Sequence, residues 1–429
     1  MKILFLAHRT PFPPNKGEKI RAYNILAQLA KRHSVSMVYW VDSPDDIDHV
    51  SALRKFCQGT VIPIYLNSSN AILRGVKSLL YGRSFSEGYF YSPKFQSLVD
   101  RLARDEKYDL VYAFSSVMAR SIMGIHDIPT IVDFVDVDSD KWGQLARFKT
   151  FPFSIFYRLE QVRLCRYEGT LSRWARWILF VSQVEADLFK RLGGSGPVAV
   201  LPNGVDSDLL CLPQRKPRLS VINGQSSPAN CPVVRLLFVG TMNYYPNTDA
   251  VLYFVKEILP LIQKRYPQVN FEIVGRFPPR SVRKLDGVGG VRVLGEVADV
   301  RSYLVRADVS VAPMRIARGV QNKVLEAMSV GVPVVATSEA VKGIQVAKEV
   351  EVLIGDSPQE FAAQIDRVLS DGALYERIST KARSRVIESY SWEGVGAGLN
   401  EIILDCGKCV SQTWEQQPSS ESSVTLELV

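Results

Sequence analysis

The sequence predicts an α/β protein with two Rossmann-like domains that face each other across a cleft. Short apolar runs alternate with longer amphipathic stretches, which is typical of mostly parallel sheets covered by helices. The alternation occurs in two series, in residues 1–206 and 233–387. Residues 212–232 between them are rich in Pro, Ser, Asn and Gln, which predicts a linker over 207–232. The 429 residues are also too many for one ordinary core.

The strands of the first series are expected at Ile3–Ala7, Val35–Trp40, Val61–Tyr65, Leu110–Ala113, Thr130–Phe134, Trp177–Val181 and Val198–Leu201. Those of the second series are expected at Arg235–Val239, Asn270–Val274, Val291–Leu294, Val309–Ala312 and Val334–Ala336. Helical stretches between them include Lys19–Arg32, Phe95–Arg104, Thr248–Tyr266, Val297–Ala307, Ala382–Tyr390 and Asn400–Leu404. Residues 406–429 are expected to form a disordered tail, because their end is rich in Ser, Glu and Gln.

The formal charge of +8 lies entirely in the first half of the chain. Residues 1–205 hold 27 Lys and Arg against 19 Asp and Glu, whereas the remainder holds 25 of each kind. This asymmetry indicates either a solvated basic surface or attraction to an anionic acceptor or anionic lipid headgroups. Nucleic acid is not predicted, because no basic run is interleaved with aromatic residues.

Two further features bear on location. The stretch Ala71–Tyr81 mixes Arg74 and Lys77 with apolar residues, so it is either an ordinary surface helix or a helix that lies on a membrane. No run reaches the roughly 18 apolar residues that span a bilayer, and the cysteines are scattered. We therefore expect a cytoplasmic protein, with contact at the inner face of the membrane as an additional possibility.

The loop after the first strand is a candidate site. It is long and Pro-rich, and it ends with Gly17 at a helix start, where the backbone can approach a phosphate or sugar closely. Lys16 and Arg21 add positive charge there and are predicted on the acceptor side. The alternative is a plain strand-to-helix loop.

Four carboxylates occur in the eight residues 133–140, at the carboxyl end of the strand Thr130–Phe134 and just beyond it. Such a cluster at a strand end indicates a metal site or a catalytic acid or base, and Asp136 is our candidate catalytic residue. The competing interpretation is that Asp138 or Ser139 caps the next helix, and we expect this of one of them.

In the second series, residues 315–337 contain the strongest candidate. A loop with Arg318 and Gly319 leads into a short helix that carries Asn322, Lys323 and Glu326. The amino end of a helix attracts phosphate, and a carboxylate further along can accept hydrogen bonds from a ribose diol. This segment therefore predicts a nucleoside diphosphate site. Gly240 and Arg276 end two earlier strands of the series and are expected to contribute to it.

Several motifs together resemble family 4 glycosyltransferases. They are Pro-Asn-Gly-Val-Asp at 202–206, Val-Gly-Thr at 239–241, Val-Gly-Arg at 274–276, and the run Val-Leu-Glu-Ala-Met-x-x-Gly-x-Pro-Val-Val that starts at Val324. The resemblance covers residues 1–405. Within that family, the segments around 133–142 and 318–328 resemble the transferases of PEP-CTERM/exosortase exopolysaccharide loci.

The resemblance implies the GT-B fold, in which a helix, here at 388–405, crosses back to the first domain. It also implies that Glu326 holds the ribose of a nucleotide-sugar donor, that Gly17 lies near the donor phosphates and that Asp136 lies near the transferred sugar. The family has a second glutamate where Arg318 stands and basic residues where Gly240-Thr241-Met242 and Asn247 stand. The diphosphate is then expected to contact Lys323, Arg318 and Arg276.

The resulting hypothesis is a metal-independent, retaining hexosyltransferase with no cofactor. It moves a sugar to a hydroxyl of a glycan or lipid-linked glycan in exopolysaccharide biosynthesis. A nucleotide-sugar epimerase with the same fold would need more acids and histidines in the cleft than this chain, with four histidines, offers. A non-catalytic nucleotide-sugar-binding scaffold also stays open, since Arg318 and Asn247 depart from the family pattern.

Overall fold

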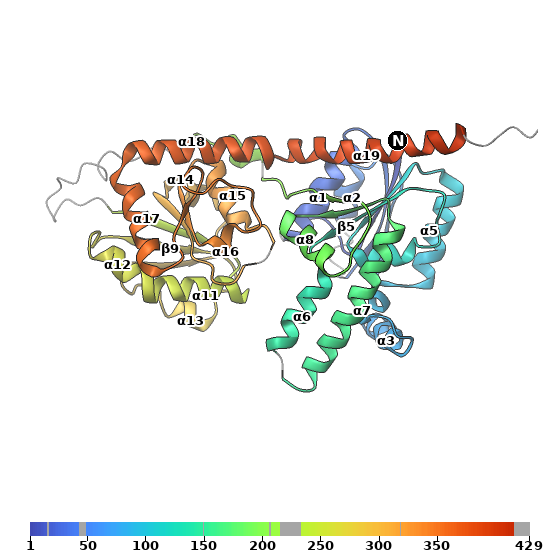
Figure 1. Cartoon of the computed structure of the whole chain (residues 1–429), viewed down its shortest axis with the longest axis horizontal. Coiled ribbons are helices and arrows are strands. Elements are labelled where there is room, and N and C mark those ends of the chain that lie inside the picture. The colour runs from blue at the N-terminus through green and yellow to red at the C-terminus, as the bar shows by residue number, and fades with distance from the viewer. Residues whose placement is uncertain are drawn as a thin grey trace, which may run out of the picture.

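The computed structural model contains two α/β domains side by side, joined along one edge by long helices (Figure 1). It describes residues 1–14, 17–42, 49–148, 150–205, 207–214, 233–317 and 319–415. Each domain holds one parallel sheet with helices on both faces, so the predicted fold class is confirmed.

The first sheet has the strand order β3-β2-β1-β4-β5-β6-β7. Its strands are β1 (Lys2–Ala7), β2 (Ser34–Val41), β3 (Val61–Tyr65), β4 (Leu110–Phe114), β5 (Thr130–Val135), β6 (Trp177–Phe180) and β7 (Val198–Val200). The order reverses between the neighbours β1 and β4, where Ile3 pairs with Leu110. Ligands of open parallel sheets bind at the carboxyl ends of the strands beside such a reversal.

The second sheet has the order β10-β9-β8-β11-β12-β13 and reverses between β8 and β11. Its strands are β8 (Arg235–Val239), β9 (Asn270–Val274), β10 (Val291–Gly295), β11 (Val309–Ala312), β12 (Val334–Ala336) and β13 (Leu353–Ile354). The strand β13 is absent from the sequence prediction, because two residues are too short to form a recognisable apolar run.

The first domain contains α1 (Gly17–Ala30), α2 (Val50–Arg54), α3 (Ser68–Leu80), α4 (Phe85–Phe90), α5 (Pro93–Glu106), the 3₁₀ helix η2 (Ser116–Ser121), α6 (Asp138–Phe148), α7 (Phe153–Trp174) and α8 (Gln183–Arg191). The second contains α9 (Ser207–Leu210), α11 (Tyr245–Tyr253), the π-helical turn η4 (Phe254–Ile258), α12 (Leu259–Gln263), α13 (Arg280–Arg283), α14 (Arg301–Arg306), α15 (Asn322–Ser329), α16 (Ser338–Val341), α17 (Pro358–Ser370) and α18 (Gly372–Ser389). None of the described helices is long and apolar enough to cross a membrane.

The stretch predicted as one helix over 248–266 has a π-helical turn, η4, between α11 and α12. Pro260 lies in the first turn of α12 and has no N–H group to donate. The regular i to i−4 ladder is therefore interrupted there, and a π turn accommodates the break.

The last helix, α19 (Trp392–Glu415), returns to the first domain and runs across its top in Figure 1. Trp392, Val395, Leu399 and Ile403 belong to the core on one face of the first sheet. The indole of Trp177 also donates to Asp405 at 3.0 Å. The helix continues past the predicted end at residue 405, so residues 406–415 are helical rather than part of a disordered tail. Residues 215–232 of the predicted linker and 416–429 of the predicted tail lie outside the described residues.

Candidate active site

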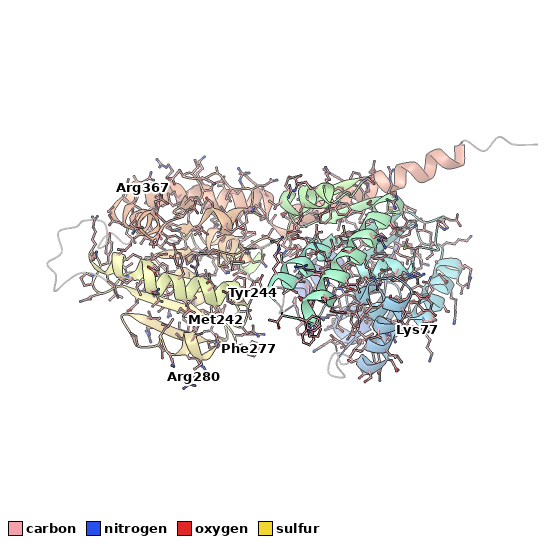
Figure 2. All side chains as sticks on the ribbon, turned by 60° about the horizontal axis from the view of Figure 1, so that its bottom comes forward. Lys77, Met242, Tyr244, Phe277, Arg280 and Arg367 are labelled. Atoms are coloured by element: carbon pink, nitrogen blue, oxygen red, sulfur yellow. The ribbon has the colours of Figure 1, made fainter. Side chains whose placement is uncertain are left out.

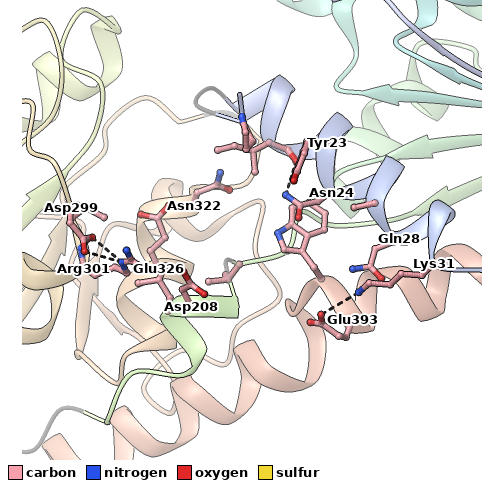
Figure 3. A pocket seen from close by; sticks show the side chains of 18 of the residues that line it. Tyr23, Asn24, Gln28, Lys31, Asp208, Asp299, Arg301, Asn322, Glu326 and Glu393 are labelled. Atoms are coloured by element: carbon pink, nitrogen blue, oxygen red, sulfur yellow. Dashed lines mark hydrogen bonds and ion pairs between the residues drawn. The ribbon is translucent and has the colours of Figure 1, made fainter. Parts of the chain in front are cut away.

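A cleft lies between the two domains and is lined by the loops that follow their strands. Its larger part, about 610 Å³, lies between α1, α15 and α19. Its smaller part, about 560 Å³, lies between the carboxyl ends of β1, β4 and β5 and the loop before α15. Asn322, the first residue of α15, lines both parts. Figure 3 shows Asn322 and Glu326 opposite Tyr23, Asn24 and Gln28 of α1.

Helix α15 begins at this cleft without a side-chain cap. Gln321 precedes the helix in an extended conformation and makes no capping bond. The loop before it turns at Gly319, whose φ of +61° favours glycine. Because no side chain caps α15, the positive end of the helix dipole faces the cleft, where it would attract an anion.

Lys323 lies one residue into α15 and is held by groups from the second domain. Its Nζ donates to Oδ1 of Asn247 at 2.7 Å and lies 4.9 Å from the centroid of the Phe238 ring. Burial lowers the pKa of Lys323 to about 8, although the carboxylate of Glu326 acts in the opposite direction. An anion bound beside this amine would stabilise its protonated form.

Glu326 lies one turn further along α15 and is partly buried in the larger part of the cleft. Arg301 and Asp299 lie on the same side of this part (Figure 3). Arg301 is bound to Asp299 at 2.9 Å and to Asp208 at 2.8 Å. The carboxylate of Glu326 therefore lines the cleft about one helical turn away from the amino end of α15, which attracts anions.

The strands β8, β9 and β10 end close together beside α15. Gly240 N–H donates to Val274 O at 2.9 Å, and a Cβ on Gly240 would lie 2.8 Å from the amide of Asn247. Arg276 follows β9 and is exposed, with its guanidinium 2.9 Å from Glu296. Phe277 beside it is 64% exposed and has a φ of +56°. Such strain in a non-glycine residue is concentrated at functional sites.

Asp136 lies in a strained turn at the end of β5. Its N–H donates to Phe134 O at 2.8 Å, and Val135 between them has a φ of +67°. This is the geometry of a classic γ-turn, which is rare, and a positive φ is a genuine outlier for a β-branched residue. The turn directs Asp136 into the smaller part of the cleft. A Cβ on Gly319 would lie 3.3 Å from Oδ1 of Asp136, so the two domains meet here.

At the start of α6, where the sequence suggested a cap by Asp138 or Ser139, two backbone N–H groups bind carboxylates of other helices. Glu185 accepts from the N–H of Val137 at 2.8 Å, and Glu168 accepts from the N–H of Ser139 at 3.0 Å. Both N–H groups at the start of α6 therefore bind carboxylates from distant helices, and Asp138 lies in the first turn of α6 beside the cleft.

The acceptor-side assignment of Arg21 is wrong. Its side chain is fully buried and forms a bidentate ion pair with Asp133, in which Nε donates to Oδ2 at 3.0 Å and Nη2 donates to Oδ1 at 3.1 Å. Tyr112 donates to the same carboxylate at 2.7 Å, and Arg21 also donates to Leu201 O. Because the guanidinium holds the sheet to α1 beneath the cleft, it cannot contact an acceptor. Lys16 and Arg318 lie outside the described residues.

Gly17 is the first residue of α1 and lines the smaller part of the cleft. His8 lies nearby, with its ring stacked on Phe114 at 5.9 Å and its Nε2 3.6 Å from Glu18. The hydrogen bond with His8 and the charge of Arg9 lower the pKa of Glu18 to about 2. The Nδ1 atom of His8 has no hydrogen-bond partner among the described residues.

Asn247, Gly319 and His8 also lie at the site, although none of them was predicted as a site residue from the sequence. From the sequence, Asn247 stood out only because the family has a basic residue at this position. In the structure its amide accepts from Lys323 Nζ and donates to Thr241 O. His8 directly follows β1, and its place at a strand end was the signal that could have identified it. Among the described residues, no group of three His, Cys, Asp or Glu side chains is arranged to hold a metal ion.

Comparison with known families accounts for this architecture. The model of "Glycosyltransferase Family 4" matches residues 16–209, and that of "Glycosyl transferases group 1" matches residues 233–371. The two matches together cover well over half of the chain and fall on its two domains. The chain therefore belongs to the family 4 glycosyltransferases.

Individual relatives are distant. The chain is 24% identical to a Mycobacterium tuberculosis glycogen synthase over 52% of this chain and 51% of the relative. It is 25% identical to "Glycosyltransferase 1 domain-containing protein 1" of Xenopus tropicalis over 35% of this chain and 46% of the relative. The matches thus span about half the length of these curated relatives.

Solved structures share the fold over nearly the whole chain. Anabaena HepE in complex with UDP has a TM-score of 0.61 and 16% identity, and covers 97% of this chain and 100% of its own. Sucrose-phosphate synthase from Thermosynechococcus elongatus has the same TM-score, identity and coverage. At this identity the likeness concerns the fold, which is that of GT-B glycosyltransferases.

Proposed function

We propose that the protein transfers a glycosyl group from a nucleotide-sugar donor to a hydroxyl of a glycan or lipid-linked glycan, as in exopolysaccharide biosynthesis. One observation carries the proposal. The uncapped start of α15, with Lys323 and Glu326, belongs to one domain, and the strained turn at Asp136 belongs to the other. They meet across the cleft at Gly319, which is where a transferred group must lie between a donor and an acceptor.

The donor binds on the second domain. The diphosphate lies at the amino end of α15, where its N–H groups and Lys323 offset the charge, and Glu326 accepts hydrogen bonds from the ribose. The exposed ring of Phe277 offers a face on which the base stacks. Arg276 contacts the diphosphate as well, after its ion pair with Glu296 has broken. Because HepE is described in complex with UDP, a uridine nucleotide is the first donor to test.

The reaction needs no metal in this proposal. The bond between the sugar C1 and the diphosphate oxygen breaks, and its electron pair stays with the diphosphate. The acceptor oxygen forms a new bond to C1 with retained configuration, and the acceptor proton passes to the departing diphosphate. Lys323 and the helix start stabilise the charge on the leaving group, while Asp136 orients the sugar or the acceptor hydroxyl.

A panel of nucleoside diphosphates, followed by the matching nucleotide sugars, tests the proposal. Thermal unfolding should move to higher temperature with the preferred nucleotide. The matching nucleotide sugar should then release diphosphate, faster when a membrane extract supplies the acceptor. Binding with no turnover under either condition would favour the non-catalytic scaffold instead.

A further inference from the structure

Helix α3 turns its large apolar side chains away from the protein. Ile72, Leu73, Val76 and Leu80 are 51%, 66%, 48% and 82% exposed, respectively. They follow one another at helical spacing and so form one continuous outer face. A surface helix of a soluble domain ordinarily buries such a face, and an exposed one marks an interaction surface.

The opposite face of α3 consists of small residues. Ala71, Gly75 and Ser78 are buried against the domain. A Cβ on Gly75 would lie 2.5 Å from the ring of Phe85, so only glycine lets α3 pack this closely on α4. This close packing fixes the orientation of α3, and its apolar face therefore points away from the domain.

A second apolar group lies on the neighbouring hairpin of α6 and α7. Phe151, just before α7, and Phe153 and Ile155, in its first turn, are 78%, 62% and 59% exposed. The hairpin extends beyond the sheet of the first domain, with α3 beside it (Figure 1). Arg163 of α7 donates to Leu79 O of α3 at 2.8 Å, which joins the two elements. We call these two groups together the apolar rim.

A basic pocket of about 230 Å³ adjoins the α3 part of the rim. Its lining includes Arg74, Lys77, Arg83 and Arg120. The acid in its lining, Glu87, is buried and engaged with the backbone of Ser84 at the start of α4. Lys77 is labelled on α3 in Figure 2, at the far end of the molecule from the second domain.

The segments that form the rim also carry an excess of positive charge. Residues 68–86 and 141–159 contain no Asp or Glu but seven Lys and Arg residues. A second copy of this chain would bring these cations against each other, whereas an anionic surface complements them. Exposed aliphatic and aromatic side chains framed by Lys and Arg are the features of a helix that lies in a membrane interface.

We propose that the apolar rim docks the first domain on an anionic lipid bilayer, and that the basic pocket binds a phosphate-bearing lipid headgroup. The docking does not depend on the proposed transfer, since it requires neither donor nor acceptor. Where the proposed function also holds, docking serves it, because Trp142 and Leu145 of α6 line the smaller part of the cleft. A lipid-linked acceptor then reaches Asp136 from the membrane surface.

Vesicle co-sedimentation of the full chain tests the docking. We expect binding to phosphatidylcholine vesicles that contain phosphatidylglycerol, little binding to pure phosphatidylcholine, and loss of binding at high salt. The triple variant Leu73→Ser/Val76→Ser/Leu80→Ser should bind at least tenfold more weakly. The variants Lys77→Gln and Arg83→Gln should each bind about fivefold more weakly. Because all five side chains are exposed, the variants should fold normally.

The controls are Val288→Ser and Lys381→Gln, which alter exposed residues of the second domain. Both should bind like the unmodified protein. Equal binding of rim variants and controls would overturn the docking surface, and equal binding to neutral vesicles would overturn the headgroup pocket. If no vesicles bind and Leu73→Ser instead abolishes self-association in sedimentation velocity, the rim is a protein interface and the proposal is wrong.

Discussion

Replacing Lys323 by methionine should change how stability depends on pH. Methionine keeps most of the volume of the side chain but cannot be protonated. In the folded protein, burial lowers the pKa of Lys323 from 10.5 to about 8, a difference of about 2.5. At about 1.4 kcal/mol for each pKa unit, the buried ammonium costs roughly 3 kcal/mol of stability at pH 7, where both states are protonated.

This cost disappears as the pH rises from about 8 to 10.5. The folded protein loses the Lys323 proton first, the unfolded chain loses it last, and above both values neither state bears the charge. The free energy of unfolding of Lys323→Met should therefore exceed that of the unmodified protein by an amount that shrinks by roughly 3 kcal/mol over this range. The absolute difference at pH 7 is smaller than this, because the variant leaves Oδ1 of Asn247 without its donor.

The assay is urea unfolding followed by circular dichroism at a series of pH values, with exposed Lys381→Met as the matched control. Circular dichroism is needed because the tryptophans lie outside residues 233–387. A difference between Lys323→Met and the unmodified protein that stays constant from pH 7 to 10.5 would refute a buried, destabilised ammonium. The same variant should weaken diphosphate binding by roughly 10- to 100-fold if Lys323 contacts the ligand.

Three further substitutions test other parts of the structure. Glu326→Ala should weaken nucleotide binding, measured by calorimetry, roughly tenfold or more, because the ribose loses its hydrogen bonds to a charged group. The control Glu376→Ala changes an exposed residue and should not alter the affinity. An unchanged affinity of Glu326→Ala would show that Glu326 does not bind the ribose. Asp136→Asn should lower the transfer rate roughly 100-fold and leave the nucleotide affinity nearly normal. The control is Asp140→Asn, because the Asp140 carboxylate binds Gln144 and does not line the cleft. Equal transfer rates of the two variants would exclude Asp136 from the reaction. Arg21→Met should lower the free energy of unfolding by about 3–5 kcal/mol, because the substitution leaves the buried charge of Asp133 unpaired. Urea unfolding measures this loss, and a loss below about 1 kcal/mol would contradict the buried ion pair.

The strands were predictable because their signal is local. A parallel sheet covered on both faces requires continuous apolar runs, and β3, β8, β9, β11 and β12 have the same bounds in the structure as in the prediction. The start of α15 was predictable for the same reason, since a glycine loop, a helix and a Gly-Val-Pro stop are all written within a short segment.

The features that sequence reasoning missed depend on contacts between distant segments. Arg21 was assigned from its charge, but its partner Asp133 lies 112 residues away. The strained γ-turn at Val135 places a β-branched residue where local preference disfavours it, so only the surrounding fold can hold it there. The apolar face of α3 has a helical period that cannot reveal which side is buried, because small residues such as Gly75 form the inner face.

Mass spectrometry of the products formed from a mixture of nucleotide sugars and a membrane extract tests most directly whether the protein transfers a glycosyl group. A membrane-extractable product that has gained one glycosyl unit should form in step with release of one nucleoside diphosphate. Asp136→Asn should form far less of it while still binding the nucleotide. If the unmodified protein binds a nucleotide sugar but forms no glycosylated product and releases no diphosphate, the cleft is not a site of glycosyl transfer.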